Sequence, residues 1–229
     1  MATRRRMETT PHERRDLISV LPIELKQRLL ECLPTRDAAR MAMLSTLWKN
    51  VWLQHGTLVF DEDFFQSIQN YVAENSTSAV NIINNILLLR GGPVKKFTLN
   101  INIKPMLQQS DVERWCSFLS RNGIEELTLH LFVLRTNAPC IFPGVTSLDF
   151  ESVELNGVAS TVPNLEKLAF LGDCEGMDKF EIIAPKLESL CHISGYSGFE
   201  PTWFAVQLNR IKTLCLSGGS FLWVRIYLA

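Results

Sequence analysis

The 229-residue sequence lacks most features that mark secreted, membrane-spanning or nucleic-acid-binding proteins. Its six cysteines are scattered without a Cys-x-x-Cys pair, which fits buried, reduced thiols better than a disulfide framework or a zinc site. No apolar stretch approaches the length that spans a bilayer, and polar residues follow the basic N-terminus where a signal peptide needs an apolar run. A formal net charge of −1 argues against nucleic-acid binding, which needs a basic face. We therefore expect a soluble protein of the nucleus or cytoplasm that binds neither membrane nor nucleic acid.

The sequence also lacks a recognisable catalytic constellation. Cys191 and His192 are neighbours, so in a strand their side chains would point to opposite faces and could not act as a nucleophile and its base. We interpret His192 as a core histidine, with a functional histidine as the alternative. Asp173, Glu175 and Asp178 lie close together, but the glycines around them indicate a turn rather than a metal site. We predict no catalytic residue, no metal site and no cofactor.

Residues 16–53 contain more apolar side chains than a short helical unit can bury. Prolines and small polar residues divide this stretch into three predicted helices. The first runs from Pro22 to Leu33, and the second, which Thr35 would cap, runs from Arg36 to Leu44. Ser45 would cap the third. Because the unit cannot bury all its Leu, Met and Trp side chains, we predict that part of its surface meets a partner.

The same stretch resembles an F-box. The resemblance is carried by the Leu21-Pro22 and Leu33-Pro34 pairs, Arg36-Asp37, Ala38-Ala39-Arg40, Leu44-Ser45 and Trp48. Proteins of this family insert a small helical motif into the Skp-type adaptor of a cullin–RING ubiquitin ligase. The resemblance implies these adaptor-binding positions: Leu21, Pro22, Ile23, Leu29, Leu30, Leu33, Pro34, Leu44 and Trp48. Some of these side chains would face the adaptor and others would hold the motif together, and we expect Trp48 to do both.

A repeat of the form apolar–x–x–apolar–x–apolar follows in the second half of the chain. Its middle residues are Phe97, Leu127, Leu148, Leu168, Leu190 and Leu214. Most steps between them fall within the ~20–29-residue period of leucine-rich repeats. Each unit would add one strand to a parallel sheet and bury its apolar side chains against its neighbours. After Ile124 the connections are too short for long helices, so we expect loops and single turns on the convex side.

The predicted fold class is α+β, or α/β in the repeats: a three-helix F-box followed by an irregular leucine-rich-repeat solenoid with a parallel sheet. We divide the chain into a disordered lead-in (1–15), the F-box (16–56), a helical linker that caps the solenoid (57–93) and the repeats (94–229). Residues 221–228 have the pattern of a further strand, with no polar capping repeat after it, so we expect an incomplete array. This arrangement is similar to that of plant F-box/leucine-rich-repeat proteins of the F-box/FBD/LRR type.

The resemblance implies a non-catalytic substrate-recognition subunit of a Skp–cullin–F-box ubiquitin ligase, acting in proteasomal degradation. Its expected partners are a Skp-type adaptor, the cullin and RING subunits behind it, and an unknown protein substrate. One alternative is a truncated F-box protein that occupies the adaptor without delivering a substrate. A second alternative is a leucine-rich interaction module unrelated to ubiquitin, and a small-molecule receptor or enzyme is a third.

Overall fold

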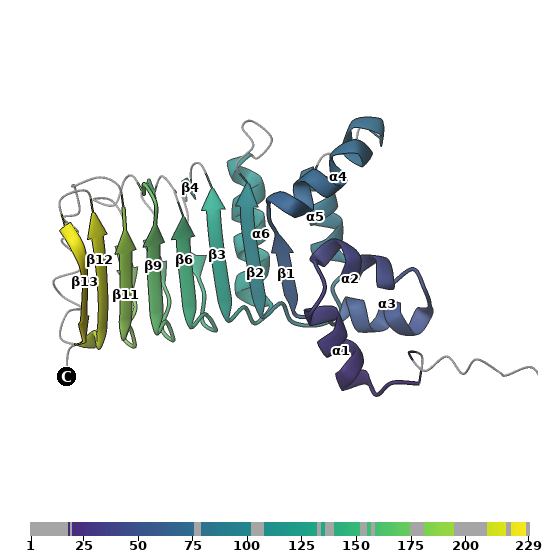
Figure 1. The fold of residues 1–229 in the computed structure, drawn as a ribbon, viewed down its shortest axis with the longest axis horizontal. Helices are drawn as coiled ribbons and strands as arrows, with labels where there is room; N and C mark the ends of the chain where they lie inside the picture. Colours follow the sequence, from purple (N-terminus) through teal and green to yellow (C-terminus); the bar gives the residue numbers. More distant parts are fainter. Residues whose placement is uncertain are drawn as a thin grey trace, which may run out of the picture.

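The computed structural model describes residue 18 and residues 20–75, 79–101, 108–131, 134–135, 140–151, 155–156, 159–174, 181–194, 210–218 and 221–227. Three short helices open this part of the chain, followed by a long sheet whose strands lie side by side (Figure 1). The helices lie beyond β1, at the opposite end of the sheet from the last strand, β13. The predicted lead-in, residues 1–15, lies outside the described residues. No helix in the described ranges is long and apolar enough to cross a membrane.

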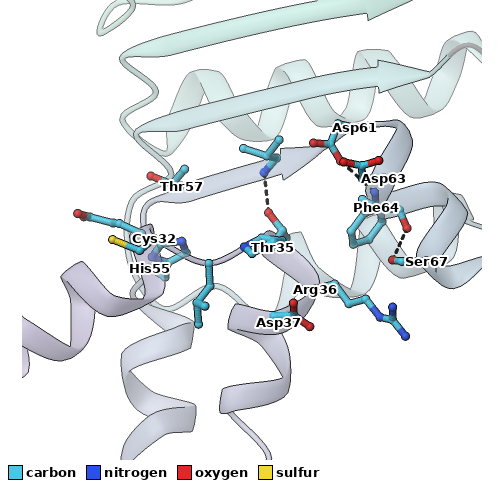
Figure 2. Close-up of a pocket in the computed structure, with 14 residues that line it drawn as sticks. Cys32, Thr35, Arg36, Asp37, His55, Thr57, Asp61, Asp63, Phe64 and Ser67 are labelled. Carbon is cyan, nitrogen blue, oxygen red and sulfur yellow. Dashed lines mark hydrogen bonds between the residues drawn. The ribbon is translucent and has the colours of Figure 1, made fainter.

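The three N-terminal helices are α1 (Ile23–Glu31), α2 (Thr35–Met41) and α3 (Thr46–Leu53). Ser45 caps α3 as predicted, because its hydroxyl accepts a hydrogen bond of 3.3 Å from the backbone N–H of Trp48. The prediction that Thr35 caps α2 was wrong, because Pro34 already holds the extended position before the helix. The Thr35 hydroxyl instead accepts a hydrogen bond of 2.8 Å from the backbone N–H of Val59 in β1 (Figure 2). Thr35 therefore joins α2 to the sheet.

The main sheet has eight strands in the order β1-β2-β3-β6-β9-β11-β12-β13. Its strands are β1 (Thr57–Phe60), β2 (Lys96–Ile101), β3 (Glu126–Leu131), β6 (Ser147–Glu151), β9 (Lys167–Leu171), β11 (Ser189–Ile193), β12 (Thr213–Gly218) and β13 (Phe221–Tyr227). All neighbouring pairs are parallel except β12–β13, which is antiparallel. The short connection after β12 explains this exception, since returning a parallel strand needs a crossover of a dozen or more residues.

The predicted repeat positions pair with one another across this sheet. The middle residues of the six segments form one row of register partners, which Leu58 of β1 extends. The row contains Leu58, Phe97, Leu127, Leu148, Leu168, Leu190 and Leu214, all of them buried. A second buried row runs beside it through Phe60, Leu99, Leu129, Phe150, Phe170 and His192. Strands β1, β2, β3, β6, β9 and β11 thus each contribute two side chains to this core, and His192 is a core histidine, as predicted.

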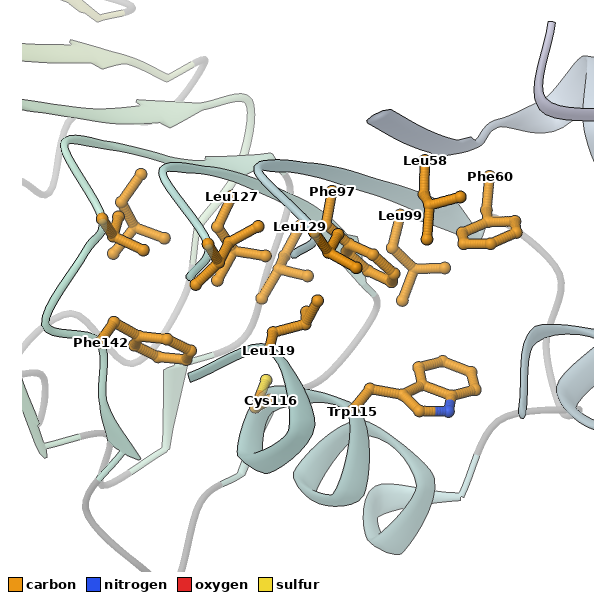
Figure 3. Close-up of a cluster of buried hydrophobic side chains, with 14 of the residues drawn as sticks. Leu58, Phe60, Phe97, Leu99, Trp115, Cys116, Leu119, Leu127, Leu129 and Phe142 are labelled. Carbon is orange, nitrogen blue, oxygen red and sulfur yellow. The ribbon is translucent and has the colours of Figure 1, made fainter. Parts of the chain in front are cut away.

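Three further helices belong to the part of the chain between β1 and β3. They are α4 (Glu62–Asn75), α5 (Ala79–Leu88) and α6 (Gln109–Arg121). Trp115, Cys116 and Leu119 of α6 pack beneath the buried rows of β2 and β3 (Figure 3). The opposite face, which no described helix covers, is called the outer face below. The Trp115 indole N–H donates a hydrogen bond of 2.7 Å to Asn84 Oδ1, which joins α6 to α5.

The other side of the repeats differs from the prediction of loops and single turns. It carries a parallel three-stranded sheet of β5 (Cys140–Ile141), β8 (Ala159–Thr161) and β10 (Glu181–Ile183). A two-stranded pair, β4 (Leu134–Arg135) and β7 (Leu155–Asn156), lies apart from it. Connections of nearly equal length bring the same segment of successive repeats side by side, so that their backbone groups pair with each other rather than only with water.

Candidate interaction surface on the N-terminal helices

Helix α1 buries one charged side chain and leaves several apolar ones exposed. Lys26 and Leu30 are buried against the rest of the three-helix unit. Ile23, Leu25 and Leu29, in contrast, are exposed. Monomeric proteins rarely expose apolar side chains grouped in this way unless they meet a partner. Folding of the unit alone does not account for the orientation of α1.

The turn between α2 and α3 adds a second group of exposed apolar side chains. Met43 is 86% exposed and Leu44 is 68% exposed, and Leu47 in the first turn of α3 is exposed as well. Together with the residues around α1 they form what we call the exposed apolar surface: Val20, Ile23, Leu25, Leu29, Leu33, Met43, Leu44 and Leu47. Burial of one such side chain contributes about 1.5–3 kcal/mol, so a few of them suffice to hold a partner.

The structure divides the adaptor-binding positions that the motif predicted into two groups. Leu30 and Trp48 are buried, with 0% and 2% of their surface exposed, so they hold the three-helix unit together and offer no contact surface. Leu21 is half-buried. The exposed members of the set are Pro22, Ile23, Leu29, Leu33, Pro34 and Leu44. The expectation that Trp48 both packs inside and meets a partner is corrected to the first role alone.

Sequence reasoning missed four members of the exposed apolar surface, namely Val20, Leu25, Met43 and Leu47. The signal that could have identified them is the excess of apolar residues over what three short helices can bury. That excess predicts that some apolar side chains stay outside, but it does not say which.

Arg90 fixes the position of the three-helix unit against the sheet. Its Nη1 donates hydrogen bonds of 2.8 Å to the backbone oxygens of Trp52 and His55 at the C-terminal end of α3. The guanidinium carbon also lies 4.1 Å from the centre of a Trp52 ring, a cation–π contact. Gly91 N–H donates a hydrogen bond of 2.9 Å to the oxygen of Leu53. Arg90 and Gly91 thus satisfy carbonyls that a helix end leaves without partners.

Burial at this joint changes the proton affinity of both titratable groups. Desolvation lowers the pKa of Arg90 to about 10, and the guanidinium is still protonated at neutral pH. Desolvation, followed by the nearby charge of Arg90, lowers the pKa of His55 to about 4. The His55 ring stacks on Trp52 with centroids 5.7 Å apart. His55 is therefore a neutral core residue at pH 7.

A cleft of about 480 Å³ lies between α2, β1 and α4 (Figure 2). Several of its polar groups hold the backbone in place. Asp61 accepts a hydrogen bond of 2.9 Å from the N–H of Phe64, and Ser67 donates one of 2.7 Å to the oxygen of Phe64. Thr35 is bonded to β1. These three groups therefore serve the local fold.

The outer face of the sheet is polar over its first strands and less polar over its last. Lys96 of β2 and Glu126 of β3 form an ion pair of 2.9 Å. Asp149 of β6 lies on the same face, and burial raises its pKa although the hydroxyl of Thr128 partly counters this. Farther along, the face continues through Ala169, Leu171, Cys191, Ile193 and Cys215. Within the described ranges, no cluster of three or more His, Cys, Asp and Glu side chains is placed to hold a metal ion.

Residues 18–59 match the family profile described as the F-box domain. An F-box/FBD/LRR-repeat protein of Arabidopsis thaliana is 39% identical over 128 residues, which are 56% of this chain and 30% of that protein. An F-box/LRR-repeat protein of the same plant is 32% identical over 120 residues, covering 51% of this chain and 30% of its own length. A second F-box/LRR-repeat protein of this plant is 27% identical over 187 residues, which are 78% of this chain and 38% of that protein.

The matches thus cover less than two fifths of the length of each of these relatives. No solved structure matches the chain. The chain carries an F-box domain, as its motif predicted, and is similar to plant F-box/LRR-repeat proteins.

Proposed function

We propose that this protein is the substrate-recognition subunit of a Skp–cullin–F-box ubiquitin ligase. The F-box match supports binding to a Skp-type adaptor, the general property of this domain family. The observation that carries the proposal is the orientation of α1, which buries Lys26 and exposes Leu25 and Leu29. An apolar partner surface would cover these side chains, and the helices of an adaptor supply such a surface.

The proposed adaptor contact is the exposed apolar surface, together with the exposed prolines Pro22 and Pro34. Leu30 and Trp48 support it from inside. The protein does no chemistry of its own in this proposal. It raises the effective concentration of a bound target near the ubiquitin-conjugating enzyme, which the cullin and RING subunits hold. We place this activity in the nucleus or the cytoplasm.

The outer face of the sheet is the proposed capture surface for the target protein. It lies on the side of the sheet away from α6, and its later strands, β9, β11 and β12, lie far from α1, so both partners can bind at once (Figure 1). We propose that the segments behind it are leucine-rich repeats stacked as a solenoid. Their support is the unbroken row of register partners from Leu58 to Leu214.

The test is co-purification of the full chain with a Skp-type adaptor. Substituting Met43→Glu and Leu44→Glu places two charges in the proposed contact without disturbing the core, since both side chains are exposed. The double variant Leu88→Glu, Leu89→Glu is the matched control. These side chains lie at the C-terminal end of α5 and are 78% and 67% exposed. A double variant of Leu21→Ala and Pro22→Ala tests the Leu-Pro pair of the motif.

We expect stoichiometric adaptor recovery with the wild type and with the Leu88/Leu89 control. The Met43/Leu44 variant should lose at least about tenfold in affinity with unchanged circular dichroism, since each charge would be buried without a partner. Failure of the folded wild type to bind would contradict the proposal and favour an interaction module unrelated to ubiquitin. If the adaptor binds but Thr128→Arg on the outer face changes no co-purified protein, the chain occupies the adaptor without delivering a substrate.

A further inference from the structure

Two cysteines face each other across neighbouring strands at the less polar end of the outer face. Cys191 of β11 and Cys215 of β12 are register partners in a parallel pair, next to each other in Figure 1. The inward positions of β11 are held by Leu190 and His192, which are buried, so Cys191 lies on the outer face. Leu214 is likewise buried, which places Cys215 on the same face. Both cysteines are half-buried.

We propose that Cys191 and Cys215 form a dithiol that small disulfides oxidise reversibly to an intramolecular disulfide. The chemistry rests on the register alone, whereas its effect on target capture rests on the function proposed above. This is a modification site at the less polar end of the proposed capture surface. Disulfides of proteins in reducing compartments are typically transient and redox-sensing, which is the behaviour proposed here.

The spacing of the strands meets the main geometric requirement. Neighbouring strands lie about 4.7–4.9 Å apart, and Cα atoms joined by a disulfide are usually about 4.4–6.8 Å apart. Side chains of a parallel pair stand side by side, so their Cβ atoms begin near the strand spacing, whereas a disulfide prefers about 3.8 Å. Closing the bond therefore draws β11 and β12 together by about 1 Å. Such strain makes a disulfide easier to reduce, which favours a reversible bond.

The other described cysteines do not offer such a pair. Cys32 lies exposed at the end of α1, and Cys116 is buried in α6 beneath the sheet. Cys174 lies after the end of β9, outside the residues that pair with a neighbouring strand. Among the register partners of the described strands, Cys191 and Cys215 are the one pair of thiols. Oxidation should therefore select them.

The reaction balances with oxidised glutathione as the oxidant. The thiolate of one cysteine attacks the glutathione disulfide, forms a mixed disulfide and releases one molecule of reduced glutathione. The second cysteine, as its thiolate, attacks the protein sulfur of that mixed disulfide and releases the second glutathione. Two protein thiols are oxidised, one glutathione disulfide is reduced to two thiols, and the protons of the cysteines pass to the released glutathione.

The test uses the purified full chain, folded by circular dichroism, incubated with oxidised glutathione and then alkylated. We expect wild type to lose two thiols and to yield a peptide pair linked through Cys191 and Cys215, which excess reduced glutathione reverses. In Cys191→Ser the mixed disulfide on Cys215 cannot resolve, so at least about tenfold more glutathione should remain on Cys215 than in wild type. Cys174→Ser is the matched control and should behave as wild type. Cys215→Ala tests the converse case, in which the mixed disulfide forms on Cys191 and cannot resolve.

Two outcomes would overturn the proposal. One is a stable glutathione adduct on Cys191 or Cys215 in wild type at the level seen in the single variants. The other is oxidation that modifies Cys32 alone or links different cysteines. Adaptor recovery is measured on reduced and oxidised protein in parallel, and we expect no change because the F-box lies at the other end of the sheet. Loss of adaptor binding in both states would contradict the proposed function and leave the result on the thiol pair unaffected.

Discussion

Replacing Arg90 with methionine should loosen the joint between the three-helix unit and the sheet. Methionine keeps much of the apolar stem of arginine but removes the guanidinium group. The backbone oxygens of Trp52 and His55 then lose the donor that now lies 2.8 Å from each of them. The Trp52 ring also loses the cation 4.1 Å from its centre. We expect the free energy of unfolding to fall.

The size of this decrease follows from two stabilising contributions that are lost and one desolvation cost that is recovered. Two hydrogen bonds to a charged donor contribute about 1.5–3 kcal/mol each, and the cation–π contact adds about 1 kcal/mol. Against these stands the desolvation of the guanidinium, which lowers the pKa of Arg90 to about 10 and costs about 3–3.5 kcal/mol. Removing the charge recovers that cost. The expected net loss is about 2 kcal/mol.

The assay is urea unfolding followed by tryptophan fluorescence and by circular dichroism. Arg40→Met is the matched control, because the Arg40 side chain is 60% exposed and its ion pair of 3.4 Å is with Asp37, which is 50% exposed. That control should change stability by less than about 0.5 kcal/mol. Arg90→Lys should recover only part of the loss, since an ammonium group lacks the planar fork of arginine. An Arg90→Met variant as stable as the control would refute the assignment of Arg90 as the joint.

Three further perturbations test separate parts of the structure by the same unfolding assay. Thr35→Val removes the acceptor for a β1 amide and should cost about 1–3 kcal/mol, whereas Thr35→Ser should cost less than about 1 kcal/mol; equal losses would contradict the hydrogen bond. Gly144→Ala would place its Cβ 2.8 Å from the Ile124 oxygen and should cost about 1–3 kcal/mol, while Gly91→Ala, 3.9 Å from its nearest neighbour, should not destabilise. Because the pKa of His55 is lowered to about 4, the unfolded chain binds more protons between pH 6.5 and 4. Stability should therefore fall as pH falls through this window, by at most about 1.4 kcal/mol per pH unit from this residue, and an unchanged slope in His55→Gln would contradict this.

The sheet could be predicted from the sequence because its signal is repeated. Each repeat contributes the same three apolar positions, and stacking brings equal positions side by side, so the six middle residues pair as expected. The direction of strand β13 could not be predicted in this way. An apolar strand pattern is the same for either direction, and the short connection after β12 sets the antiparallel pairing.

The surface of the F-box helices could be predicted only as a group of residues. Leu25, Leu29 and Leu30 all fall near one helical stripe, and the pattern does not decide which of them faces inward. In the structure, Lys26 and Leu30 face the core, whereas Leu25 and Leu29 are exposed. No pattern in the sequence near Thr35 or Arg90 indicates the role that each residue has in the structure. Their partners lie 24, 35 and 38 residues away in the sequence and are brought near only by the fold.

The central claim is that the exposed apolar surface docks on a Skp-type adaptor while the sheet stays free. Hydrogen–deuterium exchange of the full chain, with and without the adaptor, tests it most directly. We expect slower exchange in peptides that cover α1 and the turn at Met43 and Leu44, with no change in β6, β9 and β11. Protection of those strands instead, or binding that leaves α1 and the α2–α3 turn unprotected, would contradict the account.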